Sequence, residues 1–353
     1  MINKEITNKI LFVGPASKND KAGISTILET YQSLCETFKC ISTYEKINGK
    51  VSYSVYFKAY IPLIRYLFSQ NIRIVHIHGA SNGSFWRKAP IILLAHIFRK
   101  KIIFHCHGGG FKDFYNTHPR IISYILKKCD TICALSSSWK IFFEREIGCK
   151  KVCVIPNVID KPNDSIIHRE YHGVCNILFL GKICKDKGVY DLITTIGENQ
   201  NFFRGKIKIY LGGNGFVDKM NTFINKFNIN DMIEYVGYVS GQKKKELFHQ
   251  CHIFILPSYY EGIPLSILEA MSYHMPIIAT NVGGIPEIVE DGKEGILIQP
   301  RNQEQILQAI TYILSIREKW EEIGNNGYIR SSNHFPNRVK NILQNLYISL
   351  LNN

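Results

Sequence analysis

Residues 252–280 read HIFILPSYYEGIPLSILEAMSYHMPIIAT. The apolar run Ile253–Leu256 ends at a proline, which is typical of a buried strand in a parallel sheet. Pro264 suits the first position of a helix, because its missing N–H would have no partner there anyway, and the apolar residues after it recur at helical spacing. A further short apolar run follows at 276–280. The stretch therefore predicts a strand, a helix and a second strand, which is the repeating unit of a parallel α/β sheet.

Two glutamates stand out in this stretch. Glu261 falls in the loop at the carboxyl end of the predicted strand, and Glu269 lies one to two turns into the helix. Ligands of open α/β sheets bind at that end of the strands, where the amides of Leu265 and Ser266 would add the positive end of the helix dipole. Each glutamate alone is equally explained as a favourable charge at a helix start or as a solvated surface residue. Only the rest of the chain can decide between these interpretations.

The same alternation of strands and helices extends along the chain. At 353 residues the chain is long enough for two domains. A polar stretch without periodicity at 160–173 reads as a linker, and the alternation begins again after it. We predict two Rossmann-like domains, residues 1–165 and 166–335, followed by a C-terminal amphipathic helix at 336–353 that packs back on the first domain. The expected strands are 10–14, 74–79, 102–109, 131–136 and 152–157 in the first domain, and 176–181, 207–213, 233–239, 252–258, 276–280 and 295–300 in the second. In the first domain, one helix is expected around 54–69 and another around 86–98.

Composition narrows the class of protein. The hydrophobic fraction is 45%, and the ten cysteines form no C-x-x-C pair, which favours small buried thiols in a reducing compartment over a disulfide framework or a zinc cage. No apolar run reaches 18 residues, and the N-terminal residues lead into a strand instead of a signal peptide. We therefore expect a cytoplasmic protein.

The positive charge is concentrated in the first half. Residues 1–172 hold 25 Lys and Arg against 12 Asp and Glu, whereas residues 173–353 hold 18 against 17. Such a surface attracts an anionic partner. Basic residues and aromatics flank the apolar segment 89–97, which fits either a helix at a membrane interface or an ordinary core helix. Nucleic acid is disfavoured as a partner, because no nucleic-acid-binding motif is present.

Loops after the first strand of each half carry glycines and lysines, at 14–25 and 181–188. Such loops let the backbone and cationic side chains approach phosphate. Neither loop is a P-loop or a G-x-G-x-x-G turn, so a nicotinamide-dependent dehydrogenase is disfavoured. Two pairs of histidines, His76 with His78 and His105 with His107, each face one side of a strand. Core or substrate-binding histidines are favoured over a metal site, because the sequence shows no third and fourth ligands beside them.

Taken together, these residues resemble glycosyltransferase family four, the group 1 retaining enzymes of the GT-B fold. The resemblance covers almost the whole chain in the right order, and its E-x7-E element from Glu261 to Glu269 is the most specific part. GT-B implies two Rossmann-like domains whose parallel sheets face a central cleft. The matching segments are AGIS (22–25), HCHGG (105–109), VIPNVID (154–160), LFLGKICKDKG (178–188), LGGNG (211–215), PSYYEGIPLSILEAMSYHMPIIAT (257–280) and GGIPEIVEDGKEGIL (283–297).

The resemblance implies a role for each matching residue. Glu261 and His107 would be the catalytic residues, with Glu261 beside the anomeric carbon of the donor sugar. Glu269 would bind the ribose hydroxyls. Lys182, where the family usually has arginine, and Lys187 would hold the diphosphate. The other donor-binding residues implied are Gly23, Tyr238, Val239, Gly262, Ile263, Pro264, Leu265 and Ser266. No D-x-D motif is present, so neither a metal nor another cofactor is expected.

From the resemblance we expect a hexosyl transfer from a UDP- or GDP-sugar to a lipid-linked saccharide, in the synthesis of a surface polysaccharide such as O-antigen or capsule. The basic first domain would bind the acceptor and contact the anionic inner face of the plasma membrane. Two alternatives are a nucleotide-sugar epimerase on the same fold, which would need no acceptor, and a non-catalytic saccharide-binding protein. Against the second, Glu261, Glu269, Lys187 and His107 are all present together.

Overall fold

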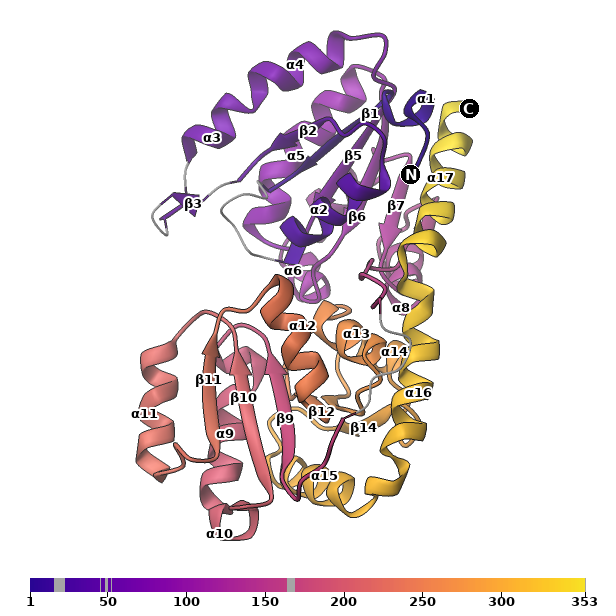
Figure 1. Cartoon of the computed structure of the whole chain (residues 1–353). Helices are drawn as coiled ribbons and strands as arrows, with labels where there is room; N and C mark the ends of the chain where they lie inside the picture. Colours follow the sequence, from indigo (N-terminus) through magenta and orange to yellow (C-terminus); the bar gives the residue numbers. More distant parts are fainter. Residues whose placement is uncertain (16–22, 45, 48–49, 52, 164–168, 353) are drawn as a thin grey trace. The chain divides into compact units, whose positions relative to one another are not determined.

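The computed structural model describes residues 1–15, 23–44, 46–47, 50–51, 53–163 and 169–352. Contacts divide the chain into two units (Figure 1). The N-terminal unit comprises Met1–Ile159 together with His334–Asn353, and the C-terminal unit comprises Asp160–Asn333. The loop predicted at 14–25 and the linker predicted at 160–173 lie partly outside the described residues, at 16–22 and 164–168.

Each unit is built on a parallel six-stranded sheet. In the N-terminal unit the order is β2-β1-β5-β6-β7-β8, and in the C-terminal unit it is β11-β10-β9-β12-β13-β14. The second order corresponds to 3-2-1-4-5-6, the Rossmann arrangement, in which the chain reverses direction across the sheet between its first and fourth strands, β9 and β12. The fold class is thus confirmed as α/β with two doubly wound parallel sheets.

The inner strands of the N-terminal sheet are short and almost fully buried, whereas its two edge strands are partly exposed. This explains why they read as continuous apolar runs in the sequence. They are β1 (Ile10–Gly14), β2 (Cys40–Ser42), β5 (Ile74–Gly79), β6 (Lys101–Cys106), β7 (Thr131–Ala134) and β8 (Val152–Val154), and a separate hairpin consists of β3 (Lys46–Ile47) and β4 (Lys50–Val51).

Helices cover both faces of this sheet. On one face lies a core that includes Leu63 and Leu67 of α4, Phe85 and Ile92 of α5, and Ile122 of α7. On the other face, Tyr31 of α2 and Tyr347 of α17 contact strand histidines. The helices are α1 (Lys4–Thr7), α2 (Gly23–Leu34), α3 (Tyr53–Lys58), α4 (Tyr60–Phe68), α5 (Gly83–Ile97), α6 (Phe111–Thr117), α7 (Pro119–Leu126), α8 (Ser137–Ile141) with the π-helical turn Phe142–Glu146, and α17 (Pro336–Asn352).

The C-terminal unit follows the same plan. Its strands are β9 (Cys175–Leu180), β10 (Ile207–Gly212), β11 (Ile233–Gly237), β12 (Ile253–Leu256), β13 (Ile277–Thr280) and β14 (Gly295–Ile298). Its helical segments are Lys185–Lys187, α9 (Val189–Glu198), α10 (Gln200–Phe203), α11 (Val217–Phe227), α12 (Gly241–Gln250), α13 (Leu265–Ser272), α14 (Ile285–Ile288), α15 (Gln303–Ser315), Arg317–Lys319, α16 (Trp320–Ser331) and Ser332–His334.

Two helical segments differ in the structure from what the sequence predicts. The segment around 54–69 forms two helices, α3 and α4, instead of one. The helix beginning near Phe85 is mainly a core helix, because Phe85, Lys88 and Ile92 are at most 1% exposed. Its basic and aromatic flanks therefore do not make α5 an interfacial helix. None of the described helices combines the length and the apolar character needed to cross a bilayer.

Candidate active site

The site in the C-terminal unit forms where the loops after β9 and β12 meet. The amide of Tyr259 donates a hydrogen bond to the carbonyl of Asp186 over 2.8 Å, and the Tyr259 hydroxyl donates to the carboxylate of Asp191 over 2.6 Å. Gly188, with φ of +68°, lies so close that a Cβ there would come within 1.9 Å of the Pro257 carbonyl oxygen. These contacts hold the two loops together at the point where the strand order reverses, which is where open α/β sheets bind ligands.

Glu261 is the central side chain of this junction. It is only 9% exposed, and its Oε1 accepts hydrogen bonds from Lys187 Nζ at 2.5 Å and from Ser258 Oγ at 2.8 Å. A buried carboxylate is stable only when paired and hydrogen-bonded, and these two partners satisfy that need. Lys187 comes from the short helical turn after β9, whereas Ser258 and Glu261 follow β12. The structure therefore brings together two residues that are 74 positions apart in the sequence.

Two glycines support the loop of Glu261 from behind. Gly283 has a φ of +56°, and a Cβ there would lie 1.8 Å from the carbonyl oxygen of Glu261. The amide of Gly284 donates to the carbonyl of Gly262 over 2.8 Å. Only residues without a side chain allow this close approach of two backbones. The glycine pair before α14 thus fixes the position of the Glu261–Gly262 backbone.

Glu269 lies on α13 and has a partner that sequence reasoning missed. Its Oε1 accepts a hydrogen bond from Lys244 Nζ of α12 at 2.6 Å, and both side chains are about a quarter exposed, at 22% and 27%. Lys244 is the middle residue of a run of three lysines, a pattern that reads as a solvated helix face. Nothing local in the sequence distinguishes it from its neighbours. Ser258 was missed as well, because nothing in the sequence around it marks it as a hydrogen-bond partner of Glu261.

The start of α13 differs by one residue from the expectation. Pro264 precedes the helix in an extended conformation, and Leu265 is the first helical residue. No side chain caps this helix. Among the described residues, no side chain accepts a hydrogen bond from the amides of Leu265 and Ser266, which suits an anion-binding helix start.

The remaining predicted donor residues of the C-terminal unit lie on loops at the same edge of its sheet. Lys182 follows β9, is exposed, and makes no hydrogen bond or ion pair with other described residues. Tyr238 follows β11 and is 40% exposed, whereas Val239 and Ile263 are buried. A hydrogen bond from the Gly213 amide to the Gly237 carbonyl joins the loops after β10 and β11. The members of the predicted set in this unit thus share one edge of the sheet, where the side chains of Lys187 and Glu261 contact each other.

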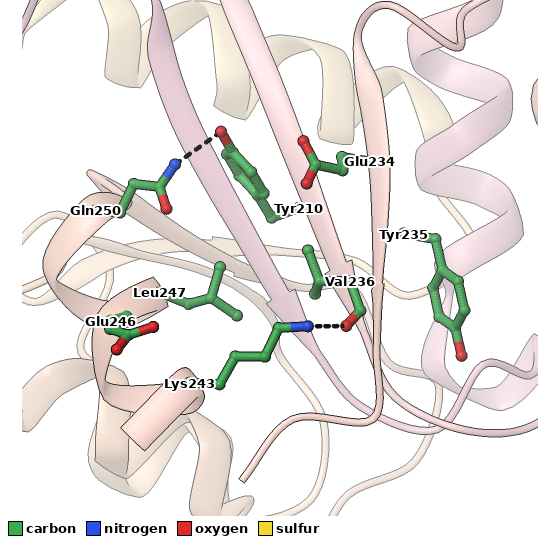
Figure 2. Close-up of a pocket in the computed structure, with 8 residues that line it drawn as sticks. All are labelled: Tyr210, Glu234, Tyr235, Val236, Lys243, Glu246, Leu247 and Gln250. Atoms are coloured by element: carbon green, nitrogen blue, oxygen red, sulfur yellow. Dashed lines mark hydrogen bonds between the residues drawn. The ribbon is translucent and has the colours of Figure 1, made fainter. Parts of the chain in front are cut away.

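A separate pocket of about 350 Å³ lies between β10, β11 and α12 (Figure 2). Two contacts cross it, from Gln250 Nε2 to the Tyr210 hydroxyl at 2.9 Å and from Lys243 Nζ to the Val236 carbonyl at 3.0 Å. None of the predicted donor residues lines it, so this pocket is not the predicted site. Its lining residues are Tyr210, Glu234, Tyr235, Val236, Lys243, Glu246, Leu247 and Gln250.

In the N-terminal unit, His107 follows β6 and joins a cluster of histidines. Its Nε2 lies 2.9 Å from Nδ1 of His78, and the two rings are parallel within 6°. Burial lowers the pKa of His107 to about 3, so the ring is neutral at physiological pH. Gly23, the other predicted residue of this unit, begins α2.

A buried lysine near this histidine was also missed. Lys88 of α5 is 1% exposed, and its Nζ donates to Ser84 Oγ at 3.0 Å. Burial lowers the pKa of Lys88 to about 7, and its charge in turn lowers the pKa of His78 and His107. In the sequence Lys88 looked like the polar flank of an apolar helix.

Most of the chain is similar in sequence to known protein families. Residues 160–330 match the family described as Glycosyl transferases group 1, and residues 42–161 match Glycosyltransferase Family 4. A Salmonella typhimurium protein named as a colanic acid biosynthesis glycosyltransferase is 35% identical over 229 residues, which are 60% of this chain and 55% of that protein. The chain spans about half the length of most of the curated relatives it matches.

Solved structures extend the similarity of fold to nearly the full chain. Sucrose-phosphate synthase from Thermosynechococcus elongatus has a TM-score of 0.77 at 15% identity and covers 97% of this chain and 99% of its own. HepE from Anabaena, solved in complex with UDP-glucose, has a TM-score of 0.76 at 16% identity and covers 96% of this chain and 99% of its own. At such identities the likeness concerns the fold, which is GT-B.

Proposed function

The chain belongs to the group 1 glycosyltransferases of family four, and from this premise we propose that it transfers a hexosyl residue, with retention of configuration, from a UDP- or GDP-sugar to a saccharide acceptor. The acceptor in this proposal is lipid-linked, and the product contributes to a surface polysaccharide. The similarity to a protein named for colanic acid biosynthesis supports that setting.

The observation that carries the proposal is the contact of Lys187 with the buried carboxylate of Glu261, where the strand order of the C-terminal sheet reverses. In the proposed complex Lys187 and Lys182 contact the diphosphate, together with the amides of Leu265 and Ser266. Glu261, with the backbone of Gly262, Ile263 and Pro264, contacts the donor sugar. Glu269 contacts the ribose, and Tyr238 and Val239 frame the base.

These residue types fit the chemistry of sugar transfer. As the acceptor hydroxyl approaches, the bond between the anomeric carbon and the diphosphate oxygen breaks, and negative charge grows on the departing diphosphate. A lysine and the N-terminus of a helix stabilise that charge where it develops, and one such donor contributes about 3–4 kcal/mol to lowering the barrier. Cationic side chains can perform this role without a metal ion bound between the phosphates.

The N-terminal unit supplies the acceptor side in this proposal. His107, neutral at physiological pH, can accept or donate a hydrogen bond to a sugar hydroxyl. Gly23 offers the donor a backbone contact without a side chain in the way. His107 follows β6, and Gly23 is the first residue of α2. We place the protein on the cytoplasmic side of the membrane, where nucleotide sugars are available.

The membrane contact that we propose lies on α3 and α4 and not on α5. Phe57, Ile61 and Phe68 are 68%, 61% and 71% exposed. Residues 46–112 contain eleven Lys and Arg and no Asp or Glu. Exposed apolar side chains beside cationic ones match an anionic lipid surface, because the apolar groups enter the interface while the cations contact headgroups.

A thermal-shift screen against UDP- and GDP-sugars tests the donor site. We expect one nucleotide class to raise the melting temperature, because a ligand that binds only the folded state stabilises it. Lys187→Ala and Glu269→Ala should abolish the shift. Lys185→Ala is the matched control, since Lys185 is exposed on the same turn and lacks the contact with Glu261. If no nucleotide sugar stabilises the folded wild-type protein, the proposed function is wrong.

A further inference from the structure

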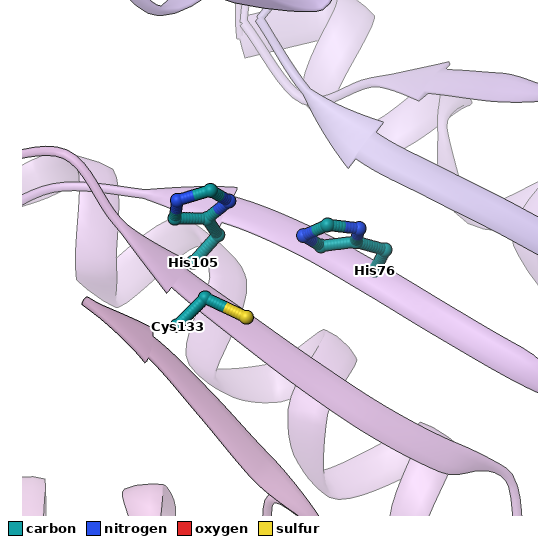
Figure 3. A group of neighbouring side chains, drawn as sticks. All are labelled: His76, His105 and Cys133. Atoms are coloured by element: carbon teal, nitrogen blue, oxygen red, sulfur yellow. The ribbon is translucent and has the colours of Figure 1, made fainter. Parts of the chain in front are cut away.

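The sheet of the N-terminal unit carries a row of imidazoles and thiols across one face. The register pairs His78 with His105, His105 with Cys133 and Cys133 with Cys153 on four neighbouring strands. His76 lies two residues before His78 and therefore faces the same side. The interior of a sheet is normally apolar, so this composition requires a physical explanation. Figure 3 shows three of these side chains, His76, His105 and Cys133, projecting from β5, β6 and β7.

These three side chains are fully buried and close together. His76, His105 and Cys133 are 0%, 1% and 0% exposed, and one ligand atom from each lies within 4.8 Å of the others. Nε2 of His76 and Nε2 of His105 have no hydrogen-bond partner among the described residues. A buried polar atom without a partner destabilises the folded state. Two such atoms beside a thiol indicate that a ligand can satisfy them.

In the rings of His76 and His105, the other nitrogen, Nδ1, already lies near a tyrosine hydroxyl. Nδ1 of His76 lies 2.8 Å from the hydroxyl of Tyr347, and Nδ1 of His105 lies 3.4 Å from the hydroxyl of Tyr31. When Nδ1–H donates to such an oxygen, the lone pair is on Nε2, which is how metal-binding histidines are usually oriented. Burial also lowers the pKa of His76 to about 3 and that of His105 well below its ordinary value, so both rings are neutral and able to bind a metal at physiological pH.

We propose that His76 Nε2, one ring nitrogen of His105 and Cys133 Sγ bind a zinc-type cation, with Cys153 as the fourth ligand. Cys153 Sγ lies 3.4 Å from Cys133 Sγ on the neighbouring strand. Zinc bonds of about 2.0–2.3 Å place tetrahedral ligands roughly 3.5 Å apart, so binding would draw His76, His105 and Cys133, whose ligand atoms lie within 4.8 Å of one another, closer together and bring in Cys153 beside Cys133. Cys133 and Cys153 each lose their thiol proton to solvent on binding.

A second group of possible ligands overlaps with this one but fits less well. His78, His105 and His107 also have ligand atoms within 4.8 Å of one another. In that group, however, Nδ1 of His78 and Nε2 of His107 already contact each other at 2.9 Å. Both groups hold buried ring nitrogens without a partner among the described residues, but the group that contains Cys133 adds a thiol with a second thiol, Cys153, beside it, and therefore carries the assignment. Closed by four protein ligands, such a site would stabilise strands β5 to β8 and would have no open position for catalysis.

Metal analysis of the untagged, full-length protein tests this proposal. After growth with zinc and purification without chelators, we expect about one zinc ion per chain. Substituting Co²⁺ should give the absorption band of a thiolate–cobalt bond. Cys133→Ser should weaken that band, because Cys153 is then the remaining thiolate ligand, and should weaken zinc binding by about tenfold or more. Cys106→Ser is the matched control, because Cys106 follows His105 on β6, is 5% exposed, and faces the opposite core.

Two results would overturn the proposal. The first is a folded wild-type protein that retains almost no zinc and shows no thiolate–cobalt band. The second is equal loss of metal in the Cys133 and Cys106 variants. If Cys133→Ser does not fold, the wild type alone decides, because chelation should lower its melting temperature and zinc should restore it. None of these measurements depends on the proposed sugar transfer.

Discussion

Gly188 shows how a single residue determines the position of the candidate site. It connects the turn of Lys187 to α9 with a φ of +68°, and its Cα lies against the carbonyl of Pro257. A residue with a side chain would push the loop of Lys187 away from the loop of Glu261. The short distance between their charged groups therefore depends on a glycine that carries no chemistry itself.

Gly188→Ala should lower the free energy of unfolding by about 3 kcal/mol, because it combines a strained backbone conformation with a steric clash. Gly205→Ala is the control, since Gly205 has a similar φ of +76° but open space around it. We expect a cost of only about 1 kcal/mol there. Urea denaturation of both variants measures the difference. Equal costs would show that the close approach to Pro257 does not matter.

At the scale of elements, the sequence predicts strands better than helix boundaries. All strands of the two six-stranded sheets except β2 fall on the predicted apolar runs, since buried parallel strands are apolar on both faces. The hairpin of β3 and β4 was not predicted. The division of the segment 54–69 was missed too, because an apolar pattern continues through the break at Ala59.

The histidine-rich strands β5 and β6 predict a dependence of stability on pH. The pKa of His76 is about 3 in the folded protein and about 6.5 in an unfolded chain. Between these values the unfolded state binds a proton that the folded state does not. The free energy of unfolding should therefore fall as the pH decreases below about 6.5, by at most about 1.4 kcal/mol per pH unit for this histidine.

Urea denaturation of chelator-treated protein at pH 7.5 and pH 5.5 checks this expectation. His76→Phe removes the titrating group but keeps a ring, and should reduce the difference between the two conditions. His172→Gln is the control, because the side chain of His172 is 81% exposed. An unchanged pH dependence in His76→Phe would contradict the account of a buried neutral imidazole.

At the scale of the whole molecule, the excess of positive charge and the exposed apolar side chains of α3 and α4 both lie in the N-terminal unit. The double variant Ile61→Ser, Phe68→Ser should reduce binding to phosphatidylglycerol vesicles about tenfold or more, because each side chain contributes about 1.5–3 kcal/mol when removed from water. Ile329→Ser on α16 of the C-terminal unit is the control, since Ile329 is 67% exposed. Vesicle flotation measures both. Equal binding by the double variant and the wild type would exclude α4 as the contact.

The candidate site was predictable only in part. Glu261 and Glu269 were found because their spacing and the strand before them place both at a ligand-binding edge. Lys187 was predicted because it lies in the glycine- and lysine-rich loop after β9. Ser258, Lys88 and Lys244 were missed, since their importance arises from contacts between distant segments, and no local pattern marks them.

The most direct test of the central claim is the rate of nucleotide release from the donor that binds, measured for the wild type and for Glu261→Gln. The glutamine keeps the size of the side chain but removes its charge. We predict that kcat falls about 10²–10³-fold while the fold, followed by circular dichroism, is unchanged. An unchanged kcat in the folded variant would contradict the assignment of Glu261 and, with it, the location of the active site.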